Sequence, residues 1–334
     1  MVDNELASVI IINRNGRKFL NGCIDSVKIQ SHNKIEMILI DNASTDESLT
    51  FVRHNYKDLT IIANSNNEGY SKAANTGIVK SKGEFILILN PDVVLEPNYI
   101  ESCLISIKKD SKIGSVSGKL LRFRTDDNHD FIDSTGLILC QDIRRPLDRG
   151  QNQRDNGQYN REEYIFGVNG AAPFYRRAML EDVKIWDEYF DEIFFAYYED
   201  VDLAWRAQLL GWKCYYTPSA VAYHYRSYLK SEDGSIGKMH AVKNRYLLYL
   251  KNEMSGSFLK DLCRNMSIEI FRLFSYIFKE RDALFGVKLV ISHILHTLKK
   301  RALIMKRVRV ERVYIESWYA NCSKEIVKFE ERTS

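Results

Sequence analysis

Several features that would place this chain in a particular class of protein are missing from its sequence. The 334 residues contain no CxxC pair, and the six cysteines lie far apart. The ligand spacing of a zinc site and that of a dithiol redox motif are therefore both missing. In a chain of this length, scattered cysteines predict buried or partly buried thiols in a reducing compartment.

Long apolar segments are missing as well. No uninterrupted apolar run reaches about 18 residues, so we predict no transmembrane helix. The N-terminal sequence MVDNELASVIIINRNG has neither the basic region nor the long apolar core of a signal peptide. A basic run, Lys299 to Arg312, indicates an acidic partner surface such as anionic lipid head groups. We therefore predict a cytoplasmic protein, with contact to the inner face of the cell membrane.

Glycine-rich phosphate loops are the third absence. Neither the Walker pattern nor GxGxxG occurs, which removes the usual support for ATP or NAD binding. A nucleotidyltransferase would also need such a loop near the first strand, and INRNGRKF does not supply one. The net charge of +4 is mild for the whole chain, and we predict no nucleic-acid partner.

What the sequence does contain is an alternation of strands and helices over its first ninety residues. Continuous β-branched and apolar runs predict four buried strands, at residues 7–13, 35–40, 59–63 and 84–89. Segments of helical periodicity separate and follow them, at 17–31, up to His54, at 70–81 and at 98–110. This order predicts an α/β fold with a doubly wound, Rossmann-like and mostly parallel sheet.

The rest of the chain is less regular. Four further strands are predicted, at 114–124, 136–141, 213–216 and 220–223. The polar segment from Thr125 to Asn160 is interpreted as a long mobile loop beside the site. Its arginines either contact phosphate or belong to a solvated loop: Arg144, Arg145 and Arg149.

From about Lys238 the sequence is helical, with no strand signal. The predicted helices are 238–252, 257–279 and 283–310. We therefore predict a catalytic domain of residues 1–235 and a helical extension of residues 236–334. Its mixture of aromatic, aliphatic and basic residues suits a bilayer interface, and packing or dimerisation is the alternative.

Polar residues follow each of the four early strands, where ligands of such sheets bind. Asp92 could hold a divalent cation that bridges two phosphates, or it could cap the next helix. Asp41 could accept a hydrogen bond from a pyrimidine imide, or it could form an Asx-turn. Gly69 suits a turn with positive φ. With Asn13 and Asn67, these residues predict a single site at one edge of the sheet.

A second group of candidate functional residues lies in the segment from Phe194 to Arg226, FFAYYEDVDLAWRAQLLGWKCYYTPSAVAYHYR. Glu199 and Asp200 are adjacent carboxylates, of which one could act as a base. The alternative is that both are charges favoured at a helix N-terminus. Asp202 and Arg206, four residues apart, predict a structural ion pair. His224 is either a metal ligand or a structural histidine.

Six motifs in one order resemble a known family. They are SVIIINRNG, IDNASTD, NNEGYSKAAN, LILNPDV, VNGAAPFYRR and YYEDVDLAWRAQLLGWKCYYTPSAVAYH. The set resembles the family 2 inverting glycosyltransferases of GT-A fold, in particular their bacterial rhamnosyltransferase-like branch. The resemblance covers about residues 6–230, and it is specific because of the order of the motifs.

The resemblance implies a role for each matching residue. Donor-binding residues would be Asn13, Arg14, Asp41, Asn67, Gly69, Lys72 and Asn90. Metal ligands would be Asp92 and His224, the catalytic base Asp200, and the acceptor-binding residues Asn169, Gly170 and Glu199. The cofactor would be Mg or Mn, and Asn90 in place of the first aspartate of the DXD motif leaves the metal's identity open.

The resemblance also implies a reaction and its partners. The chain would transfer L-rhamnose from dTDP-rhamnose to a saccharide acceptor, carried on a polyprenyl diphosphate, in cell-surface polysaccharide synthesis. The leaving group would be displaced in one inverting step. Alternatives are a UDP-hexose, UDP-galactofuranose or UDP-N-acetylhexosamine donor, or an inactive glycan- or nucleotide-binding protein. A homodimer is a further prediction.

Overall fold

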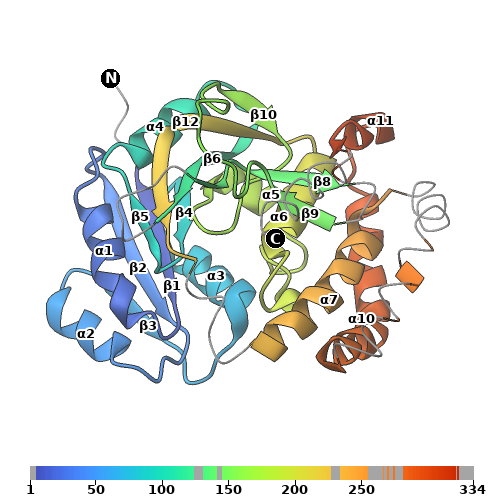
Figure 1. Cartoon of the computed structure of the whole chain (residues 1–334), viewed down its shortest axis with the longest axis horizontal. Coiled ribbons are helices and arrows are strands. Elements are labelled where there is room, and N and C mark those ends of the chain that lie inside the picture. Colours follow the sequence, from blue (N-terminus) through green and yellow to red (C-terminus); the bar gives the residue numbers. More distant parts are fainter. Residues whose placement is uncertain are drawn as a thin grey trace.

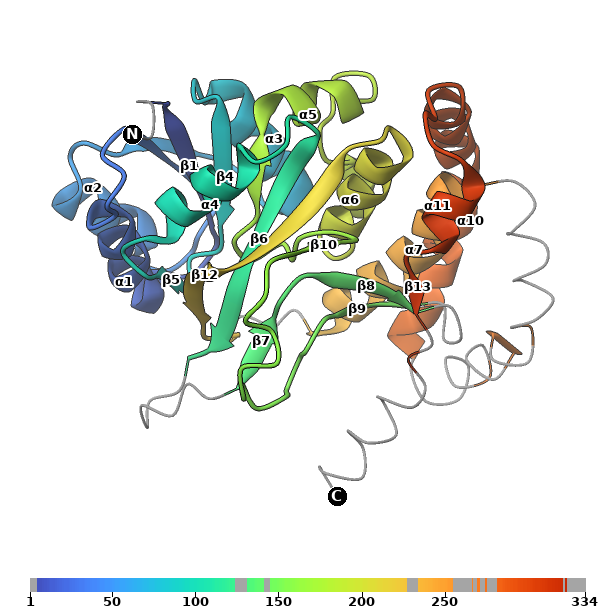
Figure 2. The same cartoon turned by 90° about the horizontal axis from the view of Figure 1, so that it is seen from above.

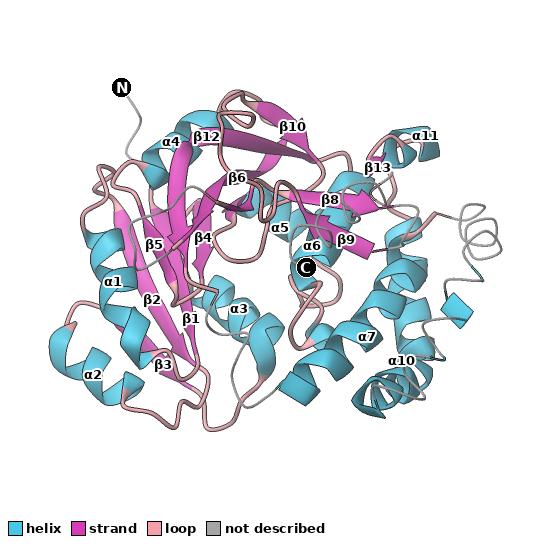
Figure 3. Ribbon diagram, viewed as in Figure 1, coloured by secondary structure: helices cyan, strands magenta, loops and turns pink. Residues whose placement is uncertain are grey.

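A computed structural model describes residues 5–123, 131–140, 145–226, 234–254 and 281–320, together with 266, 269, 270, 274 and 322 (Figure 1). Within these residues the chain forms one ten-stranded sheet and one three-stranded sheet. Helices flank the large sheet, and a further group of helices lies beside it (Figure 3).

The first half of the sheet is parallel, as predicted. Its strands lie in the order β4-β1-β2-β3. Their bounds are β1 Ala7–Asn13, β2 Ile35–Asp41, β3 Thr60–Ala63 and β4 Phe85–Leu89. The connecting helices are α1 Arg17–Lys28, α2 Ser48–Asn55 and α3 Gly69–Lys80. The order reverses between β1 and β4, and such a point is where doubly wound sheets bind ligands.

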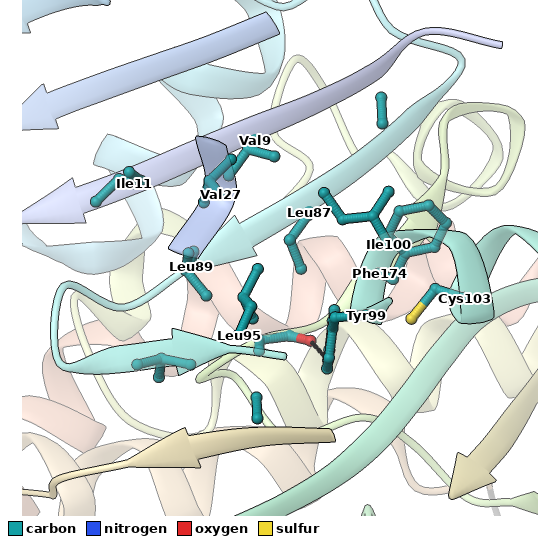
Figure 4. Close-up of a cluster of buried hydrophobic side chains, with 14 of the residues drawn as sticks. Val9, Ile11, Val27, Leu87, Leu89, Leu95, Tyr99, Ile100, Cys103 and Phe174 are labelled. Carbon is teal, nitrogen blue, oxygen red and sulfur yellow. Dashed lines mark hydrogen bonds between the residues drawn. The ribbon is translucent and has the colours of Figure 1, made fainter. Parts of the chain in front are cut away.

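Strict alternation of side chains explains why both faces of this sheet are covered. In β1, Val9 and Ile11 point to one face, whereas Ile10 and Ile12 point to the other. The first face packs on α1, α2 and α4 (Tyr99–Ile107), and Figure 4 shows this cluster around Tyr99 and Phe174. The second face packs on α3, α5 (Arg177–Val183) and α6 (Glu199–Leu209).

The second half of the sheet is mixed. Its strands are β5 Val93–Leu95, β6 Ile113–Arg122, β7 Ile132–Ser134, β10 Glu163–Ile165, β11 Phe174–Arg176 and β12 Lys213–His224. The prediction of two short strands at 213–216 and 220–223 is wrong. Both belong to β12, which pairs with β6 in parallel and shifts register between Tyr216 and Val221. The irregular stretch between them, which contains Pro218, interrupted the apolar pattern in the sequence.

The segment from Thr125 to Asn160 is more structured than predicted. It contains β7, which pairs with β6, and a hairpin of β8 (Leu137–Cys140) with β9 (Arg145–Asp148). The interpretation as one long mobile loop is therefore wrong for these strands. Their order comes from pairing with the neighbouring strands β6 and β9, which the polar composition of the segment does not show. Residues 124–130 and 141–144, the latter with Arg144, lie outside the described residues.

Helices of the C-terminal part pack beside α6. They are α7 Gly234–Asn252, α10 Arg281–Met305 and α11 Arg312–Glu316. Figures 1 and 2 both place α10 on the outer side of the molecule, away from α1. The predicted helix 257–279 falls mostly outside the described residues. Among the described helices, none is both long and apolar enough to cross a membrane.

Two C-terminal features correct the sequence predictions. A two-residue strand, β13 (Tyr319–Ala320), pairs with β8, although no strand was predicted beyond Lys238. Beside it, Cys140 and Cys322 form a disulfide with their Cα atoms 5.5 Å apart, so the prediction of six thiols is wrong for this pair. The two cysteines are 182 positions apart in sequence, and spacing along the chain does not show such proximity. Free, buried thiols are found at Cys23, Cys103 and Cys214.

A buried network of charges joins α6 to the C-terminal helices. The Lys251 ammonium of α7 lies 2.5 Å from Asp191 and 2.7 Å from Asp202 of α6. Lys300 of α10 lies 2.8 Å from Asp191 and 2.7 Å from Glu188. The predicted pair of Asp202 with Arg206 is confirmed at 3.0 Å, and it belongs to the same network.

Lys251→Ala should lower the free energy of unfolding by about 3–5 kcal/mol, because it leaves Asp191 and Asp202 with less compensation in a buried site. Lys299→Ala, an exposed change on α10, should alter it by less than about 0.5 kcal/mol. Urea unfolding followed by circular dichroism measures both. Equal effects of the two changes would contradict a structural role of the buried charges.

Candidate active site

The first group of predicted donor-binding residues lies at the ends of β1 and β2. Asn13 is fully buried and donates from Nδ2 to Asp41 Oδ1 (2.9 Å) and to Ser44 Oγ (3.0 Å). The Asp41 carboxylate also accepts from the backbone N–H of Ser44 (3.1 Å) and from its hydroxyl (2.6 Å). Asp41 therefore forms the Asx-turn that was one alternative, and this turn fixes its carboxylate at the sheet edge. Arg14 is half-buried next to Asn13.

The second group lies at the start of α3. Asn67 Oδ1 accepts from Asn42 Nδ2 (2.9 Å) and from the Gly69 N–H (3.1 Å). Gly69 has a φ of 81°, as its predicted turn requires, and a Cβ there would lie 2.5 Å from the ring of Phe195. Only glycine therefore fits at this position. Lys72 pairs with Glu68 at 2.8 Å on the exposed side of the helix.

The two predicted metal ligands, Asp92 and His224, face each other. Asp92 is buried, and neither of its carboxylate oxygens has a hydrogen-bond partner. His224 Nε2 lies 3.4 Å from Asp92 Oδ1. Asn90 precedes Asp92 on the loop between β4 and β5, and its backbone N–H donates to the Ala171 carbonyl (2.9 Å). β12 and β5 bring the pair together, because His224 is in register with Val93.

A buried carboxylate that accepts no hydrogen bond is costly, so Asp92, with His224 Nε2 at 3.4 Å, is suited to holding a cation. Carboxylate oxygen and imidazole nitrogen are both ligands of Mn²⁺, and Mg²⁺ is commonly held by one or two carboxylates together with substrate phosphates and water. Within the described ranges, no cluster of three or more His, Cys, Asp or Glu side chains forms a metal site. Asp92 and His224 thus fit a cation that a diphosphate helps to bind.

Three residues that the sequence analysis missed complete this part of the site. His224 Nδ1 lies 2.8 Å from Asp133 Oδ2, which leaves Nε2 directed at Asp92. Arg226 bridges Asp133 and Asp148, and its Nη2 donates to Asp148 Oδ2 at 2.7 Å. Asp133 and Asp148 were not identified because they stand in the polar segment that was interpreted as a loop. Arg226 stands two residues after His224, and this closeness in sequence is the signal that could have identified it as part of the site.

The electrostatics follow from this packing. Burial lowers the pKa of His224, but the hydrogen bonds and charges of Asp133 and Asp92 outweigh it and raise the pKa to about 9. For Asp133, burial acts to raise the pKa, but His224 and Arg226 hold it below its usual value. The shifted pKa values therefore favour a protonated His224 and an ionised Asp133.

The predicted base, Asp200, begins α6 next to this cluster. Its Oδ2 accepts from the Gly170 N–H at 2.8 Å, and its Oδ1 accepts from the Val201 N–H at 2.8 Å. Burial and the charge of Asp148 raise the pKa of Asp200 to about 6. A carboxylate with this pKa is mostly ionised at neutral pH and is a better proton acceptor than an ordinary aspartate.

The predicted acceptor-side residues surround Asp200. Asn169 Nδ2 donates to Asp148 Oδ1 (2.6 Å), and the Gly170 carbonyl accepts from the Tyr70 hydroxyl (2.8 Å). Glu199 is buried, and its Oε2 has no hydrogen-bond partner. Burial and the neighbouring Asp200 raise the pKa of Glu199 well above its usual value. Glu199 is therefore neutral when Asp200 carries the charge.

A chain of contacts thus joins the predicted base to the predicted metal ligands. It runs from Asp200 through Gly170, Asn169, Asp148, Arg226, Asp133 and His224 to Asp92. Arg149 does not join it: its guanidinium pairs with Glu163 at 2.6 Å and bonds the Thr135 carbonyl. Arg145 is exposed on β9.

The chain matches the family model of glycosyl transferase family 2 over residues 8–183, which is more than half of its length. Glycosyltransferase GlyG from Streptococcus pneumoniae serotype 4 is 27% identical over 167 residues, 48% of this chain and 54% of that protein. N-acetylglucosaminyl-diphospho-decaprenol L-rhamnosyltransferase from Mycobacterium tuberculosis is 23% identical over 280 residues, 75% of this chain and 86% of that protein.

The solved structure of GalNAc-T7 with UDP, GalNAc and Mn²⁺ aligns with a TM-score of 0.59 at 17% identity. The alignment covers 74% of this chain and 48% of that one, so this chain spans about half the length of both GlyG and GalNAc-T7. This likeness supports the predicted GT-A fold. The family model, which matches more than half of the chain, shows the family itself: the chain belongs to glycosyl transferase family 2.

Proposed function

We propose that this chain transfers L-rhamnose from dTDP-rhamnose to a saccharide acceptor in the synthesis of a cell-surface polysaccharide. Similarity to the mycobacterial L-rhamnosyltransferase, over 86% of that protein, supports this donor. The name of that relative also supports an acceptor on a polyprenyl diphosphate. A UDP-hexose, UDP-galactofuranose or UDP-N-acetylhexosamine donor is the alternative with the same chemistry.

The observation that carries the mechanism is the position of Asp200. It is held by two backbone N–H groups at the start of α6, and its pKa is raised to about 6. In the proposed reaction Asp200 accepts the proton of an acceptor hydroxyl, and that oxygen attacks the anomeric carbon in one inverting displacement. Neutral Glu199 and the amide of Asn169 lie beside it and orient the acceptor.

The donor lies, in this proposal, along the carboxyl edge of β1, β2 and β4. Asp41, Asn13 and Arg14 contact the base and ribose, and the turn from Asn67 to Gly69, with Lys72 beyond it, contacts the rest of the nucleotide. Asn90 stands next to the diphosphate.

Asp92 and His224 would hold the divalent cation, Mg or Mn, and its charge would stabilise the leaving diphosphate. Asp133 keeps the His224 ring oriented toward Asp92. Arg226 holds Asp133 in turn, so the ligands stay in place without substrate.

A panel of nucleotide sugars, with mass detection of the released nucleotide and product, tests this function. The expected result is turnover with dTDP-rhamnose that falls as the pH drops below about 6, because protonated Asp200 cannot accept a proton. Asp200→Asn should lower kcat by about 10²-fold or more and leave binding of the donor nucleotide nearly unchanged. Turnover with a UDP-sugar and not with dTDP-rhamnose would identify the UDP-sugar as the donor. If no nucleotide sugar is turned over, the alternative of an inactive binding protein is favoured.

Asp92→Asn should weaken Mn²⁺ binding in the presence of nucleoside diphosphate by about tenfold or more, since it removes the buried charge that faces the cation. Asp133→Asn should weaken it by about tenfold, through the orientation of His224. Titration calorimetry measures both, with the exposed Asp58→Asn as control. Unchanged Mn²⁺ affinity in Asp92→Asn would remove this carboxylate from the metal site.

Membrane contact by α10 is the last part of the proposal. Ile291, Leu295, Leu298 and Ala302 are exposed at three- and four-residue spacing, so they line one side of the helix. Exposed cations lie along the same side at Lys288, Lys299 and Lys306. No acidic residue occurs between 283 and 310. An apolar stripe beside lysines suits an anionic lipid surface, where a lipid-linked acceptor would be reached.

Leu295→Glu should reduce co-sedimentation with vesicles that contain phosphatidylglycerol by about tenfold or more, because it places an anion in the apolar stripe. The matched control is Ile29→Glu, an exposed apolar position on the other side of the molecule. If Leu295→Glu leaves vesicle binding unchanged and instead dissociates a dimer in sedimentation velocity, the stripe serves the predicted homodimer.

A further inference from the structure

The residues immediately before helix α6, which carries the proposed base Asp200, have an unfavourable backbone conformation. Phe195, Tyr197 and Tyr198 all have positive φ, at 64°, 72° and 66°. None of them is glycine, and each such residue costs of order 1–3 kcal/mol. Phe195 has a ψ of −64°, and the Ala196 N–H donates to the Phe194 carbonyl at 2.7 Å. These values describe the rare, strained form of the γ-turn. We call residues 195–198 the strap.

The strap connects the two halves of the site. On the donor side, the Phe195 carbonyl accepts from the Ser71 N–H at 3.1 Å, and its ring fills the space above Gly69. On the other side, Tyr198 is the N-cap of α6, and its carbonyl accepts from the Asp202 N–H at 2.9 Å. Glu199 and Asp200 follow directly, so the course of the strap decides where both carboxylates lie.

One side chain from the C-terminal helices fixes this strained segment. Asn244 of α7 is fully buried, and the two N–H bonds of its Nδ2 are shared among the carbonyls of Phe194 (2.8 Å), Ala196 (2.7 Å) and Tyr197 (2.7 Å). Its neighbour Lys243 donates to the Ile193 carbonyl, and His240 of the same helix stacks on the Phe195 ring. These contacts thus come from little more than one turn of α7, residues 240–244, more than 40 residues after the strap.

We propose that Asn244 is a positioning residue of the transfer reaction, which holds the strap so that Asp200 faces the acceptor hydroxyl. Strained conformations persist only where surrounding groups fix them, and they concentrate where geometry matters for function. An amide that binds three carbonyls of one segment can enforce such a conformation. The α7 helix would in this way take part in the reaction without contacting substrate. The inference rests on the proposed role of Asp200 as base.

Steady-state kinetics with Asn244→Ala test this role. The matched control is Asn252→Ala, another fully buried asparagine of α7, whose amide donates to Asp202 (2.7 Å) and to Leu248 rather than to the strap. Asn244→Ala should lower kcat by about tenfold or more, since a displacement of a reacting group by about 1 Å can cost far more than its contact energy. The Kd for nucleoside diphosphate should change by less than about threefold. Asn252→Ala should lower the unfolding temperature and leave kcat within about threefold.

Lys243→Met serves as a second variant if Asn244→Ala does not fold, because it keeps the aliphatic chain and removes the ammonium contacts to the Ile193 carbonyl and to His240 Nδ1. It should also lower kcat, by several-fold, with nucleotide binding retained. A kcat loss in Asn244→Ala and Lys243→Met no larger than that in Asn252→Ala would overturn the inference. The absence of turnover in the unmodified chain would instead overturn the proposed function.

Discussion

The packing of helix α6 between the sheet and the C-terminal helices is the constraint on which the rest of this structure depends. One side of the helix packs Leu203 and Ala207 on the sheet, and the other packs Val201 and Trp205 on the C-terminal helices. Asp202, fully buried between them, pairs with cations from both Arg206 and Lys251. A buried carboxylate is tolerated only with such partners. The first turn of the same helix also carries Glu199 and Asp200, so the packing of α6 on the sheet brings both carboxylates to the candidate site.

This arrangement changes the interpretation of the C-terminal basic run. In sequence, the cations from Lys299 to Arg312 form one block with a single acidic residue. In the structure these cations differ in their burial and in their partners. Lys300 is buried against Asp191 and Glu188, Arg307 and Arg309 pair with Asp182, and Lys299 and Lys306 are exposed. Lys299 and Lys306 are therefore available to a lipid surface, whereas carboxylates already compensate the charges of Lys300, Arg307 and Arg309.

The parts of the site that were predicted share a property: each stands where a strongly patterned element ends. Asn13 and Asp41 close β1 and β2, and Asp92 follows β4, where the apolar run stops and the parallel order leaves one place for polar groups. Asp133 and Arg226 were missed since their roles arise from pairing across about 90 positions. Asp133 stands on β7, which pairs with β6, whereas His224 stands on β12, and no local pattern shows that the two side chains meet.

The sequence by itself determined the alternating α/β order, the parallel half of the sheet, the glycine turn at Gly69 and the family to which the chain belongs. The first three follow from side-chain periodicity and backbone sterics, which act over a few residues, whereas the family was indicated by the order of six sequence motifs. The tertiary structure alone decided which cysteines pair, which lysines are buried, and how Asn244 holds the strap before Asp200. Those features depend on groups far apart in the chain, where desolvation and hydrogen-bond geometry, rather than local propensity, select the partner.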